Sequence, residues 1–280
     1  MLQMKKIILL FLANATIFFA GAQSLKTPSA STTQSVKQEF GLGSIELSYA
    51  RPNMKGRAIF GDLVPFGAIW RTGANSATTL TFSDDVIIGG TTVPAGKYGL
   101  LTMPGAAEWT VIITKQLDVT SPSAYKKEMD VVRTVVPVQN LPFSIESFTI
   151  MFNNVRSNEI ELVLLWDQTT VSLPIKQDID SKVMAQIENL MNKDNKPYFN
   201  AAMYYMDNGK DLTKASAWLE KAVEQTPTAY WVWYQKARCL SMLKKNAEAK
   251  TASLKSLELA KAGKNPDYVT LNEKLLAGLK

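Results

Sequence analysis

Apolar and polar residues alternate with a period of two over much of the first half of the chain. Ile45, Leu47 and Tyr49 are separated by polar neighbours, and the same spacing recurs in residues 109–113 and 148–152. In a β-strand, successive side chains point to opposite faces of the sheet. Each of these segments is therefore predicted to be a strand with one buried face.

Turn residues separate the alternating segments. Gly89-Gly90 predicts a two-residue hairpin loop, and Val93-Pro94-Ala95-Gly96 has Pro and Gly where a type I turn favours them. Asn153-Asn154 and Asp167-Gln168 are likewise predicted to separate strands. With roughly eight or more short strands and no helical pattern between them, residues 36–176 are predicted to form an antiparallel β-sandwich or a barrel-like closure of it.

The spacing of apolar residues changes in the second part of the chain. Val183 and Ile187 begin a pattern with intervals of three and four, which is typical of amphipathic helices. Pro197 and Pro266 fit the first turns of helices, and Asp211 is a predicted N-cap. The predicted helices cover residues 181–193, 197–207, 212–225, 228–243, 246–262 and 266–279.

The middle helices repeat with a period of 34 residues. The paired positions are Phe199 and Trp233, Met203 and Ala237, Ala215 and Ala249, Leu219 and Ser253, and Ala222 and Ser256. This pattern resembles tetratricopeptide repeats, although Lys236 and Lys261 depart from it. The resemblance implies helical hairpins at 196–229 and 230–263 within a helical domain of residues 181–280, and a protein or peptide as partner.

The chain opens with Lys5-Lys6, an apolar run over residues 7–20 and the small residues Ala20-Gly21-Ala22. These are the three parts of a secretory signal peptide, so residues 1–22 are predicted to be removed, before a flexible Ser/Thr/Gln-rich lead-in at 23–35. The apolar run is shorter than the ~20 residues of a membrane span, and no Cys is placed to carry a lipid. We predict a soluble periplasmic or extracellular protein without a stable membrane span, with an uncleaved signal anchor as the alternative.

Composition excludes several classes of function. The net charge of +6 falls to +4 without the leader, and neither half of the remaining chain has a concentrated basic stripe, so no nucleic-acid partner is predicted. The sequence has no His, which excludes His-dependent nucleophiles and His-rich metal sites. The single Cys239 cannot form an intramolecular disulfide and is predicted to be buried.

An unusual block of Arg, Gly and aromatic residues follows the first strands. It reads Arg51-Pro52-Asn53-Met54-Lys55-Gly56-Arg57, Phe60-Gly61, Leu63-Val64-Pro65-Phe66-Gly67 and Trp70-Arg71-Thr72-Gly73-Ala74-Asn75. Together with Ala95-Gly96-Lys97-Tyr98-Gly99-Leu100, these motifs resemble an exported bacterial family, the domain of unknown function 2911, over residues 25–175. The resemblance implies the β domain but no activity. Residues 116–125 resemble the family least.

The candidate binding residues in these motifs are Arg51, Lys55, Arg57, Trp70, Arg71, Asn75 and Tyr98. Arginine presents a planar fork that suits a carboxylate or phosphate, and Trp offers a large rigid surface. The functional interpretation is a cleft that recognises an anionic or glycan ligand. In the structural interpretation, Trp70 is a core residue and the arginines brace the loop by pairing with Asp62, Glu46 or buried carbonyls.

The main prediction is a non-catalytic binding or scaffold protein, with no catalytic residue, metal or cofactor assigned. The alternative is a carboxylate-dependent, glycosidase-like hydrolase of envelope or extracellular glycans, because that chemistry needs no His. The nearest carboxylates are Glu46, Asp62, Asp84 and Asp85, and their spacing selects no pair.

Aromatic residues at the start of the second repeat are candidates for partner binding. Trp233 and Tyr234 fit the repeat core, whereas Tyr230 and Trp231 lie at the edge of the predicted hairpin. Because helical repeats bind partners on an extended face, Tyr230 and Trp231 are the candidate partner-binding residues, with core packing as the alternative.

Export is directly testable. If the signal peptide is removed as predicted, N-terminal sequencing of the mature protein will read from Gln23, and the protein will fractionate with soluble envelope or extracellular material. Recovery of the uncleaved chain in the membrane pellet would show a signal anchor instead.

Overall fold

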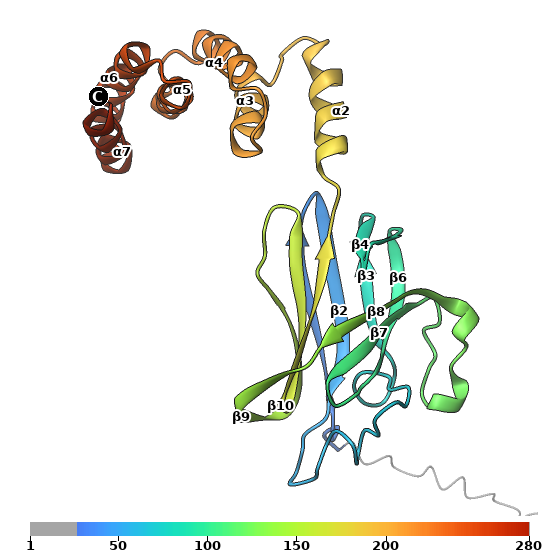
Figure 1. Cartoon of the computed structure of the whole chain (residues 1–280). Helices are drawn as coiled ribbons and strands as arrows, with labels where there is room; N and C mark the ends of the chain where they lie inside the picture. Colours follow the sequence, from blue (N-terminus) through green and yellow to red (C-terminus); the bar gives the residue numbers. More distant parts are fainter. Residues whose placement is uncertain (1–26, 280) are drawn as a thin grey trace, which may run out of the picture. The chain divides into compact units, whose positions relative to one another are not determined.

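A computed structural model describes residues 27–279, so the predicted signal peptide lies outside the described residues. The chain divides into two compact units, one ending at Lys176 and the other beginning at Gln177 (Figure 1). The first unit contains the strands and the second contains the α-helices. This order confirms the predicted fold class.

Two antiparallel sheets form the first unit. The six-stranded sheet has the order β1 (Thr32–Phe40), β2 (Gly43–Arg51), β3 (Thr78–Phe82), β6 (Gly96–Met103), β7 (Glu108–Thr114) and β8 (Asp130–Pro137). The four-stranded sheet has the order β5 (Thr91–Val93), β4 (Val86–Ile88), β10 (Glu159–Lys176) and β9 (Gln139–Asn153). Every strand pair in the two sheets is antiparallel.

The alternating residues of both sheets meet in one hydrophobic core. Ile45 and Leu47 of β2 and Val111 of β7 are fully or almost fully buried, as are Leu162 and Leu164 of β10 on the other sheet. Because one cluster draws on the inward faces of both sheets, the unit is a β-sandwich.

The strand boundaries differ from the predictions at two places. β1 begins at Thr32, inside the predicted lead-in, because Thr32–Ser35 pair with Ser48–Arg51. This strand lies at the edge of its sheet and is largely exposed, so its polar composition gave no alternating pattern. Asp167-Gln168 also do not separate strands: they lie within β10 at a bulge, where Asp167 has φ +51°.

The predicted hairpin at Gly89-Gly90 is confirmed. It joins β4 to β5, and both glycines have positive φ, +56° and +80°, as a type I′ turn requires. A side chain at Gly89 would also collide with Thr134, because its Cβ would be 2.8 Å from that residue's Oγ1 and Cβ atoms.

Six α-helices form the described part of the second unit, as predicted. They are α2 (Asp180–Met191), α3 (Tyr198–Asp207), α4 (Leu212–Gln225), α5 (Tyr230–Met242), α6 (Asn246–Ala262) and α7 (Pro266–Gly278). Asp211 caps α4 by accepting hydrogen bonds from the backbone N–H groups of Thr213 and Lys214. Pro197 precedes the first residue of α3 and is not within its first turn, whereas Pro266 opens α7 as predicted.

Most of the positions that repeat at an interval of 34 residues are buried, although Phe199, Met203 and Trp233 are only partly so. Ala215 and Ala249 are fully buried, and Ser253 and Ser256 occupy the places of Leu219 and Ala222. The two serines meet the fully buried Asn272 of α7: Ser253 Oγ donates to Asn272 Oδ1 at 2.9 Å, and Asn272 Nδ2 donates to Ser256 Oγ at 2.8 Å. At these two positions hydrogen bonds take the place of apolar contact, whereas elsewhere Leu275 of α7 packs on the cluster that contains Ala249 and Ala252 of α6.

Cys239 lies in the core of the helical unit, as predicted. Its side chain is fully buried, and burial raises the pKa of its thiol to about 11. A thiol with so high a pKa is mostly protonated at neutral pH and is a poor nucleophile. Among the described residues, no helix combines the length and the apolar character that a membrane crossing requires.

Candidate functional site

The segment between β2 and β3 forms one side of a pocket. Residues 52–77 have no regular strand and lie at the end of the sandwich away from the C-terminal end of β10 (Figure 1). The pocket has a volume of about 600 Å³ and is lined mainly by this segment, with Ala30-Ser31, Ser121-Pro122 and Trp166 contributed from elsewhere. A volume of this size is typical of small-molecule sites.

Aromatic rings form the base of this pocket. The Trp70 indole stacks on Trp166 of β10, with centroids 5.9 Å apart and an interplanar angle of 16°. Phe60, Trp109 and Phe148 contact Trp70 at centroid distances of 6.1, 6.1 and 4.9 Å. Trp70 is thus both a core residue and a pocket residue.

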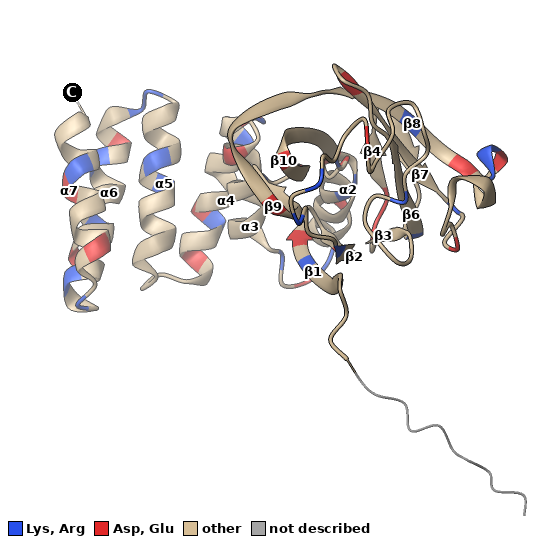
Figure 2. Cartoon of the chain, turned by 90° about the horizontal axis from the view of Figure 1, so that it is seen from below, with Lys and Arg blue, Asp and Glu red and all other residues tan. Residues whose placement is uncertain are grey.

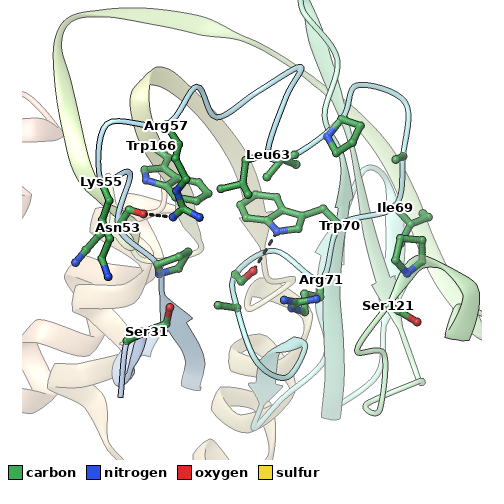
Figure 3. A pocket seen from close by; sticks show the side chains of 18 residues that line it. Ser31, Asn53, Lys55, Arg57, Leu63, Ile69, Trp70, Arg71, Ser121 and Trp166 are labelled. Atoms are coloured by element: carbon green, nitrogen blue, oxygen red, sulfur yellow. Dashed lines mark hydrogen bonds between the residues drawn. The ribbon is translucent and has the colours of Figure 1, made fainter. Parts of the chain in front are cut away.

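Backbone hydrogen bonds fix Trp70 to the six-stranded sheet. Its N–H donates to the Thr102 carbonyl at 2.7 Å, and the Thr102 N–H donates back to the Trp70 carbonyl at 3.0 Å. The indole Nε1 donates to the Gly73 carbonyl at 3.1 Å (Figure 3). The side chain and the turn that follows it are therefore held in one arrangement.

The turn after Trp70 contains unusual backbone conformations. Thr72 has φ +57°, which is rare for a β-branched residue, and Gly73 has φ +148°. Thr72 is held by hydrogen bonds of its hydroxyl with Trp70 and Thr102, and its carbonyl accepts from the Thr78 hydroxyl. Such strain persists only where surrounding contacts fix it, and it is enriched at functional sites.

The three arginines of the block have different partners. Arg51 donates to the Phe148 carbonyl at 3.1 Å and to Thr149 Oγ1 at 2.8 Å, and so joins β2 to β9 outside the pocket. Arg57 donates from Nε to the Met54 carbonyl at 2.9 Å and from Nη2 to the Asn53 carbonyl at 2.6 Å. It therefore closes its own turn.

Arg71 reaches a different loop. Its Nη1 donates to the Thr120 carbonyl at 2.7 Å, which ties the segment after β2 to the loop between β7 and β8. Its Nε is buried and has no hydrogen-bond partner among the described residues. A buried donor without a partner is costly in a folded protein and calls for an explanation.

Four of the seven candidate binding residues line the pocket: Lys55, Arg57, Trp70 and Arg71. In Figure 3, Lys55 and Arg57 lie to the left of the Trp70 indole and Arg71 lies below it. The described lining includes no Asp or Glu. The pocket therefore combines three cationic side chains with mainly apolar walls.

The other three candidates lie outside this lining. Arg51 braces β9, as described above. Asn75 donates from Nδ2 to the Ser31 carbonyl at 3.2 Å, which holds the segment before β1 near the rim. Tyr98 is buried and donates to the Pro94 carbonyl at 2.8 Å, and burial, with a smaller contribution from Asp85, raises the pKa of its hydroxyl.

Three parts of the pocket come from segments in which the sequence pattern predicts no binding residue: Ala30-Ser31, Ser121-Pro122 and Trp166. Trp166 is only 1 % exposed and belongs to a strand far along the chain, although it is an inward position of an alternating segment. Ser121-Pro122 belong to the loop that least resembles the family. The buried Gln116 closes this loop: its Nε2 donates to the Ala124 carbonyl at 2.7 Å, and its Oε1 accepts from the Lys126 N–H at 2.8 Å.

The candidate partner-binding residues of the helical unit lie in an aromatic cluster. Tyr230 contacts the rings of Trp231 and Tyr268 at centroid distances of 5.0 and 4.9 Å, and its hydroxyl accepts from Asn265 Nδ2 at 3.0 Å. Trp231 remains 43 % exposed. Tyr230 is therefore packed, whereas Trp231 presents its ring to solvent.

Charged residues on the helices are mixed in sign (Figure 2). Lys221 pairs with Glu224, and Lys255 pairs with Glu258, each at 2.9 Å one helical turn apart. These exposed pairs are spread along the helices and do not indicate a particular binding surface. The exposed Trp231 is the better indication of one.

In the turn after Arg71, we expect stability to be sensitive to substitution of Gly73. At Gly73 a Cβ would be 2.9 Å from the Ala50 carbonyl oxygen and would adopt φ +148°, whereas at Gly56, with φ +72°, it would meet nothing within 4 Å. We expect Gly73→Ala to lower the free energy of unfolding by about 3 kcal/mol and Gly56→Ala by about 1 kcal/mol. Chemical denaturation measures both, and equal losses would contradict the role of the Gly73 contact.

Comparison with known proteins identifies the first unit. Neither the curated proteins nor the solved structures include a match to this chain. Residues 218–251, which run from α4 through α5 into α6, match a tetratricopeptide repeat. Residues 31–175, about half of the chain, match the family described as Protein of unknown function (DUF2911). The resemblances found in the sequence are thereby confirmed in the same order, and the chain belongs to the DUF2911 family.

Proposed function

We propose that this protein is an exported binding protein whose β domain takes a small anionic ligand in the pocket beside Trp70. The observation that carries this proposal is the charge of the lining. Lys55, Arg57 and Arg71 border the pocket, and no carboxylate does so among the described residues. Cationic groups around an apolar site favour an anion, because charge interactions strengthen where water is excluded.

An anion agrees with the geometry better than a glycan does. Sugars bind proteins by stacking on exposed aromatic faces, but the Trp70 ring is packed against Trp166 and three further aromatic rings. Trp166 is almost completely buried. The indoles therefore serve as the base of the pocket rather than as a free stacking platform.

The hydrolase alternative has less support. A glycosidase needs two carboxyl groups on either side of its substrate. Glu46 forms an ion pair with Lys37 at 3.2 Å, and Asp85 accepts a hydrogen bond from the Ala95 N–H at 2.8 Å. Asp62 and Asp84 do not line the pocket either.

The helical unit supports a second binding role. Tetratricopeptide repeats are protein-interaction modules, and the matched repeat contains Trp231 at the start of α5. An exposed Trp is a frequent anchor of protein interfaces. We therefore propose that Trp231 contributes to the binding of a protein or peptide.

The anion site can be tested by removing its charge. We expect the triple variant Lys55→Gln, Arg57→Gln, Arg71→Gln to bind the fluorescent anion anilinonaphthalene sulfonate at least about tenfold more weakly than the wild type. The matched control removes the same charge outside the pocket through Lys97→Gln, Lys115→Gln and Arg156→Gln. Thermal melts confirm that both variants fold. Equal affinity in both variants would reject the pocket as an anion site.

The proposed role of Trp231 predicts a loss of protein binding that does not depend on the anion site. Trp231→Ala should remove proteins co-purified with the wild type while lowering stability by about 1 kcal/mol or less, because the ring is partly exposed. Leu254→Ala on α6 is the control, since Leu254 is also exposed, at 48 %. Quantitative mass spectrometry of the bound proteins makes the comparison. Retention of all partners by the Trp231 variant would contradict the assignment.

A further inference from the structure

One edge of the Arg71 guanidinium has an unmet hydrogen-bond donor. A guanidinium binds a carboxylate most specifically through two parallel N–H groups, and Nε with Nη2 forms one such edge. In Arg71 the bond to the Thr120 carbonyl uses Nη1, on the opposite edge. Nε is buried without a partner in the described part of the chain. A buried donor needs an acceptor, and none of the described residues supplies one to Arg71 Nε.

Arg57 differs from Arg71 in this respect. Its Nε and Nη2 both donate to backbone carbonyls, those of Met54 and Asn53. The corresponding edge is thus already used within its own turn. Lys55 offers a charge but no planar fork. Of the three cationic side chains in the described lining, Arg71 is the one suited to hold a carboxylate with two parallel bonds.

The surroundings of Arg71 are apolar. Ile69 and Pro122 belong to the same pocket, together with Leu63 and the Trp70 indole. In Figure 3, Ile69 lies to the right of Trp70 and Leu63 above it, with Arg71 below. A small hydrophilic anion would leave these walls without contact, and a neutral apolar molecule would leave Arg71 Nε without an acceptor.

We infer that the ligand is a small monocarboxylate with a compact apolar body, either aromatic or branched aliphatic. Its carboxylate accepts from Nε and Nη2 of Arg71, and its body packs on Trp70, Ile69 and Leu63. This inference rests on the proposed anion site and adds the class of ligand and the residue that anchors it. The pocket's volume of about 600 Å³ suits a molecule of this kind.

Titration calorimetry of the full mature chain tests the ligand class. The probes are phenylacetate, indoleacetate and isocaproate, each compared with its own primary amide, and with acetate and sulfate. We expect at least one of the three carboxylates to bind about tenfold or more tightly than its amide and than acetate. Sulfate should bind no better than acetate, because it cannot use the apolar walls.

Substitution of Arg71 tests the anchor. Arg71→Lys keeps the charge but loses the planar edge, so we expect it to weaken carboxylate binding about tenfold or more. Arg156→Lys makes the same chemical change at an exposed position in the turn between β9 and β10 and should leave binding unaltered. Arg57→Lys should have a smaller effect than Arg71→Lys, because the edge of Arg57 is engaged internally.

The outcomes separate this inference from the anion site itself. Suppose that the affinity for anilinonaphthalene sulfonate depends on the pocket charges, but acetate and sulfate bind as tightly as the larger carboxylates. The inference about the ligand class then fails, whereas the anion site stands. The same holds if Arg71→Lys binds like the wild type, or if none of the three carboxylates binds. Both proposals fail if the amides bind as tightly as the acids and the triple variant at Lys55, Arg57 and Arg71 binds anilinonaphthalene sulfonate as tightly as the wild type. The comparison of acid and amide uses the wild-type protein, so it decides the ligand class even if an Arg71 variant does not fold.

Discussion

The contact between Trp70 and Trp166 is the interaction on which the pocket depends. Trp166 belongs to the four-stranded sheet, whereas the backbone of Trp70 is hydrogen bonded to Thr102 of the six-stranded sheet. One side chain therefore connects an irregular segment to both layers of the sandwich. Aromatic pairs of this kind contribute about 0.5–1.5 kcal/mol each beyond the burial of their area. Several such pairs meet at Trp70, so the segment around it has a fixed place although it contains no regular strand.

Bracing and recognition are divided among the arginines of the same block. Arg51 donates to the Phe148 carbonyl of β9, and Arg57 donates to the Met54 and Asn53 carbonyls of the turn after β2. Arg71 also braces the loop, because it donates to the Thr120 carbonyl, but its Nε has no hydrogen-bond partner among the described residues. The strained turn at Thr72 and Gly73 directly follows Arg71. The structural and functional interpretations of the block are thus compatible within a single loop.

The sequence predicts the fold far better than the site. Alternation of apolar and polar residues in segments such as Ile45–Tyr49 indicates strands with one buried face and so predicts the sandwich. The 34-residue period predicts the helical repeats. The half-buried face of the edge strand β1 has polar Gln34 and Gln38 on either side of Val36, so it shows no apolar alternation, and a bulge such as that at Asp167 is decided by the partner strand. In the site, Lys55, Arg57, Trp70 and Arg71 are found because they cluster in the sequence. Trp166 and Pro122 join them only through folding, and the free edge of Arg71 depends on bond directions that no residue type encodes.

The hydrogen bonds of Asn272 with Ser253 and Ser256 have a consequence for how the helices recognise one another. Apolar surfaces between repeats accept almost any complementary apolar helix, because hydrophobic contact has little directional character. Here a helix that lacks a correctly placed amide would leave the buried Ser253 hydroxyl without its acceptor, whereas the Ser256 hydroxyl would keep only its bond to the Tyr230 carbonyl. The surface of α6 therefore favours the helix that supplies this amide over one that offers apolar contact alone.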